Sequence, residues 1–278
     1  MTGHVGAYGL ALPDIAPETA RLLGPAPADW PEWRLEHRPT GHEDWELEKL
    51  WPDRARLRLS GGGWTEIDGS RQVAALHTPN PPAHAIAHPY LGLIAAVAAY
   101  WRGWNYFHAG AVVVDGTVWG VLGDRGSGKT STLGFLARRE GVEILCDDVL
   151  VLDKDAQAYA GPRCTDLRED AAAHLGVGEP LGVVGARERW RAPLGPVEPR
   201  LPLNGWIDLH WGPTAGLERP GAGERFTALA RGLALRLVPP DPAGLLALTD
   251  APFLAFTRPR GLERLDGALD PLLDALRS

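Results

Sequence analysis

Short stretches of alternating hydrophobic and polar residues mark the first part of the chain. In the run 54–68, Leu57 and Leu59 alternate with arginines, and three glycines at 61–63 precede a second alternating run. A period of two predicts half-buried strands, and the glycine cluster predicts the turn between them. We therefore expect residues 1–88 to form a small β-rich region.

This region also holds five of the eleven tryptophans: Trp30, Trp33, Trp45, Trp51 and Trp64. Large aromatic side chains are more often buried than exposed, which favours the interpretation that they fill a thin core. A docking groove for a peptide partner is the alternative.

A proline-rich segment, TPNPPAHAIAHP at 78–89, separates this region from the rest of the chain. Proline resists both helices and sheet ladders, so the segment predicts a boundary. The run that follows, 90–104, is almost continuously apolar and predicts a mostly buried helix ending near Gly103. We expect 89–278 to form the second, larger domain.

Two predicted hairpins surround a glycine-rich loop. The β-type runs 111–114 and 117–123 are separated by Asp115 and Gly116, a pair that favours two-residue hairpin turns. Downstream, 143–161 predicts a strand, a turn at 153–155 and a returning strand, with a helix at 129–139 between the two hairpins. Hairpins in this position predict an α/β fold with a mixed sheet instead of an all-parallel one.

The tail, from about residue 201, mixes both patterns. The runs 204–211 and 232–238 are β-like, whereas 242–250 and 262–278 have helical character. Six leucines at near-helical spacing predict one apolar face for the last helix: Leu262, Leu265, Leu269, Leu272, Leu273 and Leu276.

Charge and cysteine content narrow the class of protein. A net charge of -7 without blocks of like charge argues against nucleic acid or an anionic membrane as a partner. Cys146 and Cys164 are too few for a disulfide framework and are expected to be buried thiols. The run 91–101 is too short to span a bilayer, and the start of the chain does not resemble a signal peptide. We expect a cytoplasmic protein.

The loop GDRGSGKT at 123–130 fits the pattern G-x-x-x-x-G-K-[ST]. Its backbone N–H groups can converge on phosphate oxygens at the positive end of the following helix. Lys129 would bridge the β- and γ-phosphates, and the Thr130 hydroxyl would hold Mg²⁺. The predicted nucleotide-binding residues are Gly123, Asp124, Arg125, Gly126, Ser127, Gly128, Lys129, Thr130 and Ser131.

Asp147 and Asp148 follow the apolar run 142–146, 18 and 19 residues after Lys129. Neighbouring side chains on a strand face opposite ways, so both carboxylates reach one site only if the strand ends or bulges there. One would hold the metal and the other would take a proton from an attacking hydroxyl. The alternative is that one of them caps a turn.

Other candidate residues carry less specific signals. His108 precedes the first hairpin and would lie beside the carboxylates if that hairpin folds back along the loop strand. Arg168 and the cluster Arg187, Arg189 and Arg191 are candidates for stabilising a transferred phosphate, with Arg168 and Arg191 favoured.

Residues 107–153 resemble the core of the HPr kinase/phosphorylase family. That core has a histidine, a hairpin, the phosphate loop, a helix ending near a glycine, and an Asp-Asp pair. The resemblance implies a phosphate-loop kinase core with a mixed sheet, related to phosphoenolpyruvate carboxykinase, that uses ATP and Mg²⁺. It implies a catalytic site of Lys129, His108, Asp147 and Asp148, with Thr130 and Asp147 at the metal and Asp148 as the base.

The chain also departs from that family. Thr130 and Ser131 follow the loop lysine where the family has Ser-Glu, and the later glycine-rich signature and basic stretch are absent. These departures argue against HPr as the substrate, against phosphorolysis and against a hexamer. The chain is similar to shorter HPr-kinase-like proteins, including kinases that phosphorylate a terminal serine of lasso-peptide precursors.

The leading hypothesis is an ATP- and Mg²⁺-dependent kinase that transfers the γ-phosphate to a serine-type hydroxyl, favouring a ribosomal, lasso-type precursor peptide. The alternatives are a kinase for a small hydroxyl-bearing molecule, such as a free amino acid or a natural product, and a nucleotide-dependent switch that transfers nothing. A homo-oligomer is compatible with each of them.

Overall fold

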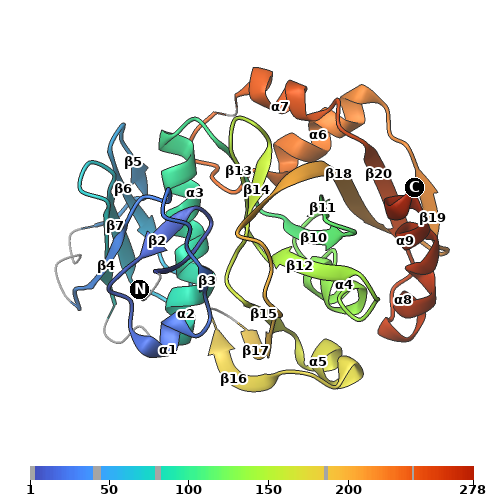
Figure 1. Ribbon diagram of the computed structural model, residues 1–278, viewed down its shortest axis with the longest axis horizontal. Helices are drawn as coiled ribbons and strands as arrows, with labels where there is room; N and C mark the ends of the chain where they lie inside the picture. Colours follow the sequence, from blue (N-terminus) through green and yellow to red (C-terminus); the bar gives the residue numbers. More distant parts are fainter. Residues whose placement is uncertain (1–3, 40–44, 79–82, 185–186, 240) are drawn as a thin grey trace.

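The protein is an α/β structure with mixed sheets. A computed structural model describes residues 4–39, 45–78, 83–184, 187–239 and 241–278. Among these residues the strands form four sheets, of which the largest lies at the centre of the molecule (Figure 1). Its strands run in the order β12-β10-β11-β18-β14-β13-β9, and β18 also pairs with β20, which pairs with β19.

The central sheet combines the two predicted hairpins with parallel pairs. Strands β10 and β11 are antiparallel, whereas β18 is parallel to both β11 and β20, which confirms the mixed sheet. The strand bounds are β9 Asn105–Phe107, β10 Gly110–Val114, β11 Thr117–Leu122, β12 Val142–Cys146, β13 Leu150–Leu152, β14 Gln157–Tyr159, β18 Arg200–Trp211, β19 Gly216–Glu218 and β20 Phe253–Arg258.

The hairpin that carries the loop is buried on both faces, which explains its continuous apolar sequence. Val113 and Val118 pack into one hydrophobic cluster, and Val112 and Val121 pack into another on the opposite face. Alternate side chains of a strand point to opposite faces, so both sets must be apolar. The turn residues Asp115 and Gly116 both have positive φ, as the Asp-Gly pair predicts.

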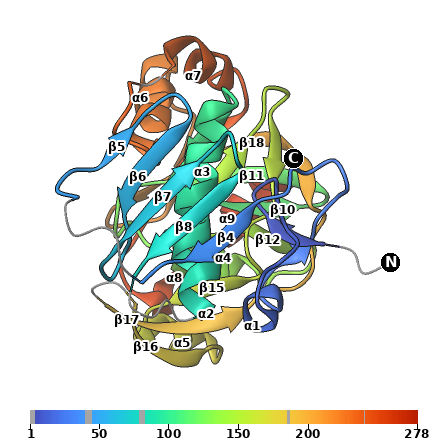
Figure 2. The same cartoon turned by 90° about the vertical axis from the view of Figure 1, so that its left-hand side faces the viewer.

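Helices cover the two faces of the central sheet. The first cluster includes α3, which lies between the central sheet and a second, five-stranded sheet (Figure 2). The second cluster includes α4, α8 and α9. The helix bounds are α1 Pro17–Ala20, α2 Ala83–Ala85, the π-helical turn Ile86–Tyr90, α3 Leu91–Trp101, α4 Lys129–Leu136, α5 Glu169–Leu175, α6 Ala222–Gly232, α7 Pro242–Leu248, α8 Leu262–Ala268 and α9 Asp270–Arg277.

The five-stranded sheet belongs to the N-terminal part and has the order β4-β8-β7-β6-β5. Its strands are β4 Arg34–His37, β5 Lys49–Leu50, β6 Arg54–Arg58, β7 Trp64–Asp68 and β8 Val73–His77. The antiparallel pair β6 and β7 is the hairpin predicted for 54–68. Its buried residues share a hydrophobic cluster with α3 and the central sheet, and the division into 1–88 and 89–278 stays a prediction.

The burial of the N-terminal tryptophans supports the interpretation that they fill a core. Trp30, Trp33 and Trp64 are buried, and Trp45 and Trp51 are half-buried. None of the five lines the cavity that contains the glycine-rich loop, and only Trp30 lines a smaller cavity of about 310 Å³. Burial of such large side chains stabilises a thin region of the molecule, whereas a groove would leave them exposed.

Two smaller sheets complete the fold. One, with the order β2-β1-β3, is formed by β1 Val5–Ala7, β2 Leu10–Leu12 and β3 Gly24–Pro25. The other, with the order β15-β17-β16, contains β15 Cys164–Leu167, β16 Glu179–Val184 and β17 Arg187–Pro193. We call this second sheet the flap sheet, because it projects from the central sheet together with α5.

Three sequence predictions need correction. The run 232–238 is not a strand: α6 ends at Gly232, and Leu233 forms only an isolated bridge to Phe107. The last predicted helix is two helices, because Pro271 cannot continue α8. Helical structure begins at Ala83, inside the proposed boundary segment, of which 79–82 lie outside the described residues.

Other features agree with the sequence. Cys146 and Cys164 are buried free thiols. None of the helices in the described part of the chain has both the length and the apolar character that crossing a bilayer requires.

The leucine face of the tail gives a stability prediction. Leu272 is fully buried in the cluster beneath α4, whereas Leu246 on α7 is 59% exposed. Leu272→Ala should lower the free energy of unfolding by about 2–5 kcal/mol, because it leaves a cavity. The control Leu246→Ala should change it by less than about 0.5 kcal/mol. Urea unfolding of both variants measures the difference, and equal effects would contradict the packing described here.

Candidate functional site

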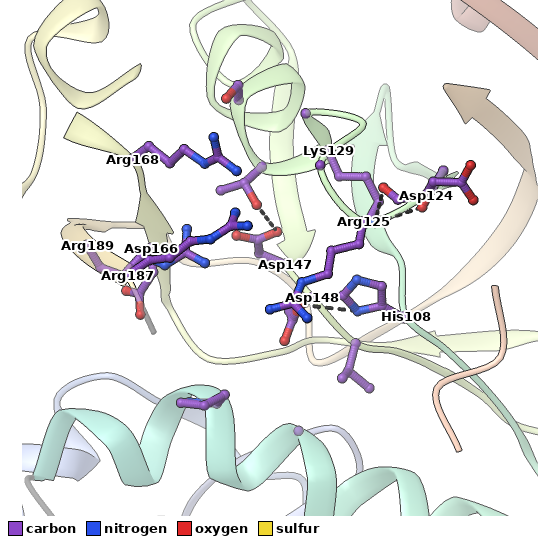
Figure 3. Close-up of a pocket in the computed structure, with 18 of the residues that line it drawn as sticks. His108, Asp124, Arg125, Lys129, Asp147, Asp148, Asp166, Arg168, Arg187 and Arg189 are labelled. Carbon is purple, nitrogen blue, oxygen red and sulfur yellow. Dashed lines mark hydrogen bonds and ion pairs between the residues drawn. The ribbon is translucent and has the colours of Figure 1, made fainter. Parts of the chain in front are cut away.

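A cavity of about 1090 Å³ lies at one end of the central sheet. Its walls are the loop after β11, the start of α4, the segment after β12, one side of α3 and the flap sheet (Figure 3). The segments that follow α6 and β20 complete it. Loops at the ends of strands are the usual place for binding residues in α/β proteins, because a rigid sheet positions them.

The glycine-rich loop has the backbone that its sequence requires. Gly123, Gly126 and Gly128 have φ values of +143°, +84° and +81°, which favour glycine. A Cβ atom built on Gly126 would meet no atom within 4 Å, so this part of the loop is open to the cavity. The loop ends where α4 begins, at Lys129, so the positive end of that helix faces the cavity.

Lys129 is buried across this loop. Its Nζ donates a hydrogen bond to the Gly123 carbonyl oxygen at 2.8 Å, and the residue is 7% exposed. Burial lowers the pKa of Lys129, and the nearby carboxylates of Asp148, Asp147 and Asp124 oppose that shift. Nζ also lies 3.5 Å from the Asp124 carbonyl oxygen, which leaves one of its three donors for an anionic ligand in the cavity.

The two aspartates reach the cavity together because the chain leaves the sheet between them. Strand β12 ends at Cys146, and the next strand, β13, pairs with different neighbours. Asp148 has a φ of +74°, in the left-handed region that Asp tolerates better than most residues. The alternation of a regular strand is therefore broken, and both carboxylates line the same cavity.

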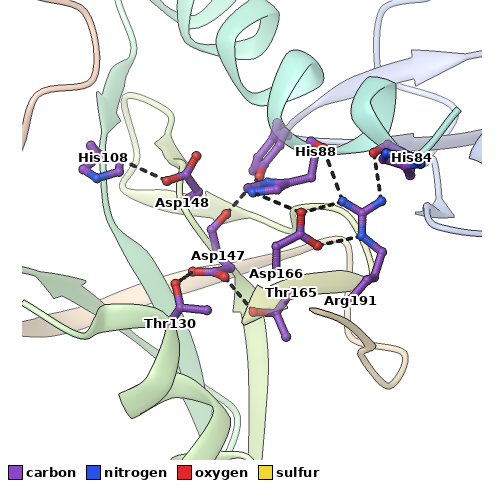
Figure 4. Close-up of polar contacts among 10 residues, drawn as sticks. His84, His88, His108, Thr130, Asp147, Asp148, Thr165, Asp166 and Arg191 are labelled. Carbon is purple, nitrogen blue, oxygen red and sulfur yellow. Dashed lines mark hydrogen bonds and ion pairs between the residues drawn. The ribbon is translucent and has the colours of Figure 1, made fainter. Parts of the chain in front are cut away.

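Asp147 is buried and fully engaged (Figure 4). It accepts a hydrogen bond from the Thr130 hydroxyl at 3.1 Å on one oxygen and from the Thr165 hydroxyl at 2.6 Å on the other. Burial raises the pKa of Asp147, while the charge of His88 and these hydrogen bonds oppose that shift. Each carboxylate oxygen thus has a hydrogen-bond donor, and a bound cation would further stabilise the buried charge.

Asp148 has a different environment. Its carboxylate is 38% exposed and lies 3.2 Å from Nδ1 of His108. Partial burial would raise the pKa of Asp148, but the His108 hydrogen bond and the charges of His88, His108 and Lys129 outweigh it and hold the pKa well below its usual value. Asp148 is thus an ionised, accessible carboxylate beside a buried one.

His108 is held in place by the backbone. Its N–H donates to the Gly232 carbonyl oxygen at 2.6 Å, at the end of α6. The residue follows β9, which pairs with β13 directly after the aspartates. The hairpin strand β10, which begins two residues after His108, folds back along β11 and also pairs with β12, where Ala111 lies opposite Cys146. His108 therefore lies beside Asp148, as expected from the hairpin.

Arg191 has a structural role and does not line the cavity. Its guanidinium binds both oxygens of the buried Asp166 at 2.6 and 2.7 Å, and donates to the carbonyl oxygens of His84 and His88. Such a bidentate pair uses most of the guanidinium donors. The prediction that Arg191 stabilises phosphate is therefore corrected: this arginine joins the flap sheet to the segment before α3.

Arg258 is a site residue that the sequence did not single out. It ends β20, is fully buried, and its guanidinium donates to the Thr132 hydroxyl at 2.9 Å and to the Ser127 carbonyl oxygen of the loop. The guanidinium also lies 4.1 Å from the ring centre of Trp211. A Cβ on Gly128 would come within 2.8 Å of it, so Arg258 lies directly against the loop.

The charge of Arg258 has no carboxylate partner among the described residues, and its Nη1 has no hydrogen-bond acceptor there. Burial lowers its pKa to about 10. A buried ion without a counter-charge is costly. A polyphosphate bound in the adjacent loop would supply that counter-charge.

Arg231 is a second cation missed by the sequence analysis. It binds the buried Asp208 carboxylate at 2.8 Å and contacts Asp124 of the loop at 3.1 Å. Asp208 is on β18, opposite Leu122 of the loop strand, and also lies 3.0 Å from His210. This network ties the loop to α6. With 25 arginines in the chain, no local pattern distinguishes Arg231 or Arg258 from the others.

Most predicted site residues meet in this cavity. The cavity is lined by Gly123, Asp124, Arg125, Gly126, Gly128, Lys129, Thr130, Ser131, His108, Asp147, Asp148 and Arg168. Ser127 is the one predicted loop residue that does not line the cavity. It is buried, and its hydroxyl has no partner among the described residues. In Figure 3, Arg168 extends toward the start of α4, and Arg125 points toward Asp148.

The oxygen atoms present fit a hard divalent cation. Thr130 and Asp147 offer a hydroxyl and a carboxylate next to the loop. Within the described ranges, no three His, Cys, Asp or Glu side chains are arranged to hold a metal ion. Mg²⁺ is commonly held by one or two protein oxygens together with phosphates and water, and this donor set suits that mode.

Comparisons with known proteins find little likeness. No protein-family model matches the chain, and no curated protein matches it. Among solved structures, the chain is similar to the Hpr(Ser) kinase/phosphatase from Coxiella burnetii, at 15% sequence identity and a TM-score of 0.30. The match covers 62% of this chain and 97% of that one. A likeness of this extent carries no argument about function, and membership of that family stays a prediction.

Substitution of Arg258 tests its role at the loop. Arg258→Met keeps the aliphatic contact with Trp211 but removes the charge and the donors to the loop. We expect the affinity for ADP to fall roughly ten- to hundredfold, since a hydrogen bond to a charged group contributes about 1.5–3 kcal/mol. Isothermal titration calorimetry measures the affinity.

The Arg258→Lys variant, which keeps the charge without the planar fork, should lose less. Thermal unfolding without nucleotide shows whether each variant is folded. A folded Arg258→Met variant with unchanged ADP affinity would contradict the role given to this arginine.

Proposed function

We propose that the protein is an ATP- and Mg²⁺-dependent kinase that transfers the γ-phosphate to a serine-type hydroxyl. The observation that carries the proposal is the division between the two adjacent carboxylates. Asp147 is buried between the Thr130 and Thr165 hydroxyls, whereas Asp148 is exposed to the cavity and held ionised by His108. Phosphoryl transfer to a hydroxyl needs one carboxylate near the metal and another near the acceptor.

The nucleotide phosphates would bind in the glycine-rich loop. The loop N–H groups other than that of Ser127, which bonds to the Asp124 carbonyl oxygen, would supply the donors together with the Lys129 ammonium and the start of α4. Arg258 would stabilise the loop from beneath, and Arg168 would approach the transferred phosphate from α5. Thr130 and Asp147 would hold Mg²⁺, which when bound neutralises charge on the phosphates.

Asp148 would orient the acceptor hydroxyl and accept its proton. As the hydroxyl oxygen bonds to phosphorus its proton becomes acidic, so a carboxylate with a low pKa suffices as the acceptor. His108 fixes the position of Asp148 through its 3.2 Å contact. Lys129 and the arginines would contribute to catalysis by positioning the phosphates and neutralising their charge.

The cavity of about 1090 Å³ would hold both the nucleotide and the acceptor, because it extends from the loop to the flap sheet. The proposed acceptor is a precursor peptide of the lasso type, with a free amino acid or natural product as the alternative.

A nucleotide-dependent switch that transfers no phosphate is the competing class. A switch needs the loop and a metal-holding carboxylate, which Lys129, Thr130 and Asp147 would supply. It does not need Asp148 in a left-handed conformation beside His108.

Asp148→Asn tests the proposal. The variant keeps the shape of the side chain and removes its charge, so phosphate transfer should fall by at least about a hundredfold, within the range for loss of a general base. Binding of ADP with Mg²⁺ should change less than about threefold. The assay is incubation with γ-labelled ATP and serine-containing peptides, with the mass increase of each peptide as the readout.

Asp250→Asn, at an exposed position outside the cavity, is the matched control and should transfer phosphate at the original rate. Unchanged turnover of Asp148→Asn would show that Asp148 is not the base. Tight ADP binding by the original protein without transfer to any peptide, amino acid or water would favour the switch.

A further inference from the structure

The strand β17 presents three arginines on one face. Arg187, Arg189 and Arg191 occupy alternate positions, and Glu188 and Trp190 between them point to the other face. β17 pairs with β15 without a break from Trp190 to Pro193. Against β16 the register shifts opposite Arg189 and Trp190, but the extra residue lies on β16, so β17 itself keeps one residue per position. The three guanidinium groups therefore form a row that begins beside Asp166.

The members of this row differ in their partners. Arg191, the innermost, is neutralised by Asp166 and is 8% exposed. Arg187 is exposed and Arg189 is half-buried. Both line the cavity, and neither side chain forms an ion pair or hydrogen bond with any residue that the structure describes. Asp170, the other carboxylate on this side of the cavity, does not pair with them.

The whole cavity is positively charged in an acidic protein. Ten arginine and lysine residues line it, against six aspartates and glutamates, although the chain as a whole has a net charge of -7. A concave surface of one charge attracts ligands of the opposite charge and raises their rate of association. The nucleotide phosphates account for the cations at the loop, but Arg187 and Arg189 are on the flap sheet.

The three arginines lie on the side of the cavity opposite the phosphate loop, where the acceptor would bind. Asp147 joins the two sides of the cavity, because Thr130 at the start of α4 and Thr165 on β15 both donate to it. The phosphates belong to the α4 side, and β17 pairs with β15 on the other side. Figure 3 shows Asp147 between Lys129 and the two arginines, and Asp148 beside His108. An acceptor whose hydroxyl reaches Asp148 would extend over β17.

We infer that the flap sheet is the binding site for an acidic peptide segment flanking the acceptor serine, with Arg187 and Arg189 as the residues that recognise it. The inference rests on the proposed kinase function. Side chains on one side of an extended peptide repeat about every 6.6–6.8 Å, which is the spacing of alternate residues on β17. Aspartate or glutamate side chains at alternate positions would each meet one arginine, in the paired geometry that arginine forms with carboxylates.

The experiment uses a mixture of peptides with one central serine and randomised neighbours, incubated with the full-length protein, ATP and Mg²⁺. Sequencing of the phosphorylated products by mass spectrometry gives the preferred residue at each position. Aspartate and glutamate should be enriched at positions within about four residues of the serine. Individual acidic and neutral peptides then provide kcat and KM.

The variant Arg187→Glu/Arg189→Glu reverses the charge of the row. We expect KM for an acidic peptide to rise at least about tenfold, with kcat and the affinity for ADP nearly unchanged. The library preference should shift from acidic toward basic neighbours. The control Arg34→Glu/Arg219→Glu makes the same change in net charge at exposed positions outside the cavity and should leave KM and the preference unchanged.

The outcomes separate the two proposals. If phosphate reaches neutral and acidic peptides equally, or only small molecules, the kinase proposal holds and the acidic-peptide site is wrong. If the double variant loses ADP affinity as much as peptide affinity, the two arginines bind the nucleotide and the inference also fails. If no hydroxyl acceptor gains phosphate although ADP binds, the kinase proposal itself fails.

Discussion

The site depends on one buried carboxylate and the two hydroxyls that hold it. Asp147 binds Thr130 at the start of α4 and Thr165 on β15, so it links the loop helix to the flap sheet across the end of the central sheet. A buried carboxylate must be satisfied by donors or a cation. The next residue, Asp148, has a left-handed conformation, and its carboxylate lies in the cavity beside His108.

The mixed sheet explains why these groups converge. The loop strand β11 lies between its hairpin partner and the parallel strand β18, which carries Asp208 and Trp211 at its end. Arg231 and Arg258 reach the loop from α6 and β20 and bind it through Asp124 and the Ser127 carbonyl. The loop is therefore held from below by cations, which would counter the charge of bound phosphates.

Local sequence patterns predicted the groups near the loop. Asp115 and Gly116 predicted the hairpin, and the Asp-Asp pair after an apolar strand predicted the two carboxylates. The other contacts of the site depend on packing between residues that are far apart in the sequence. The sequence around Arg258 does not indicate its contact with the loop, and the sequence around Thr165 does not indicate its contact with Asp147. Arg191 resembles Arg187 and Arg189 in sequence, and only the fold brings Asp166 against it. The run 232–238 has the alternation of a strand, but its first residue ends α6 and the residues after it form a connection and not a strand.

The central claim is that the Asp147 carboxylate holds the metal and that the Asp148 carboxylate orients the acceptor hydroxyl and accepts its proton. Calorimetric titration of ADP with and without Mg²⁺, on the original protein, Asp147→Asn and Asp148→Asn, tests it most directly. The account predicts that Mg²⁺ strengthens ADP binding in the original protein and in Asp148→Asn, and that this enhancement is lost in Asp147→Asn. Full enhancement in Asp147→Asn, or its loss only in Asp148→Asn, would contradict the account.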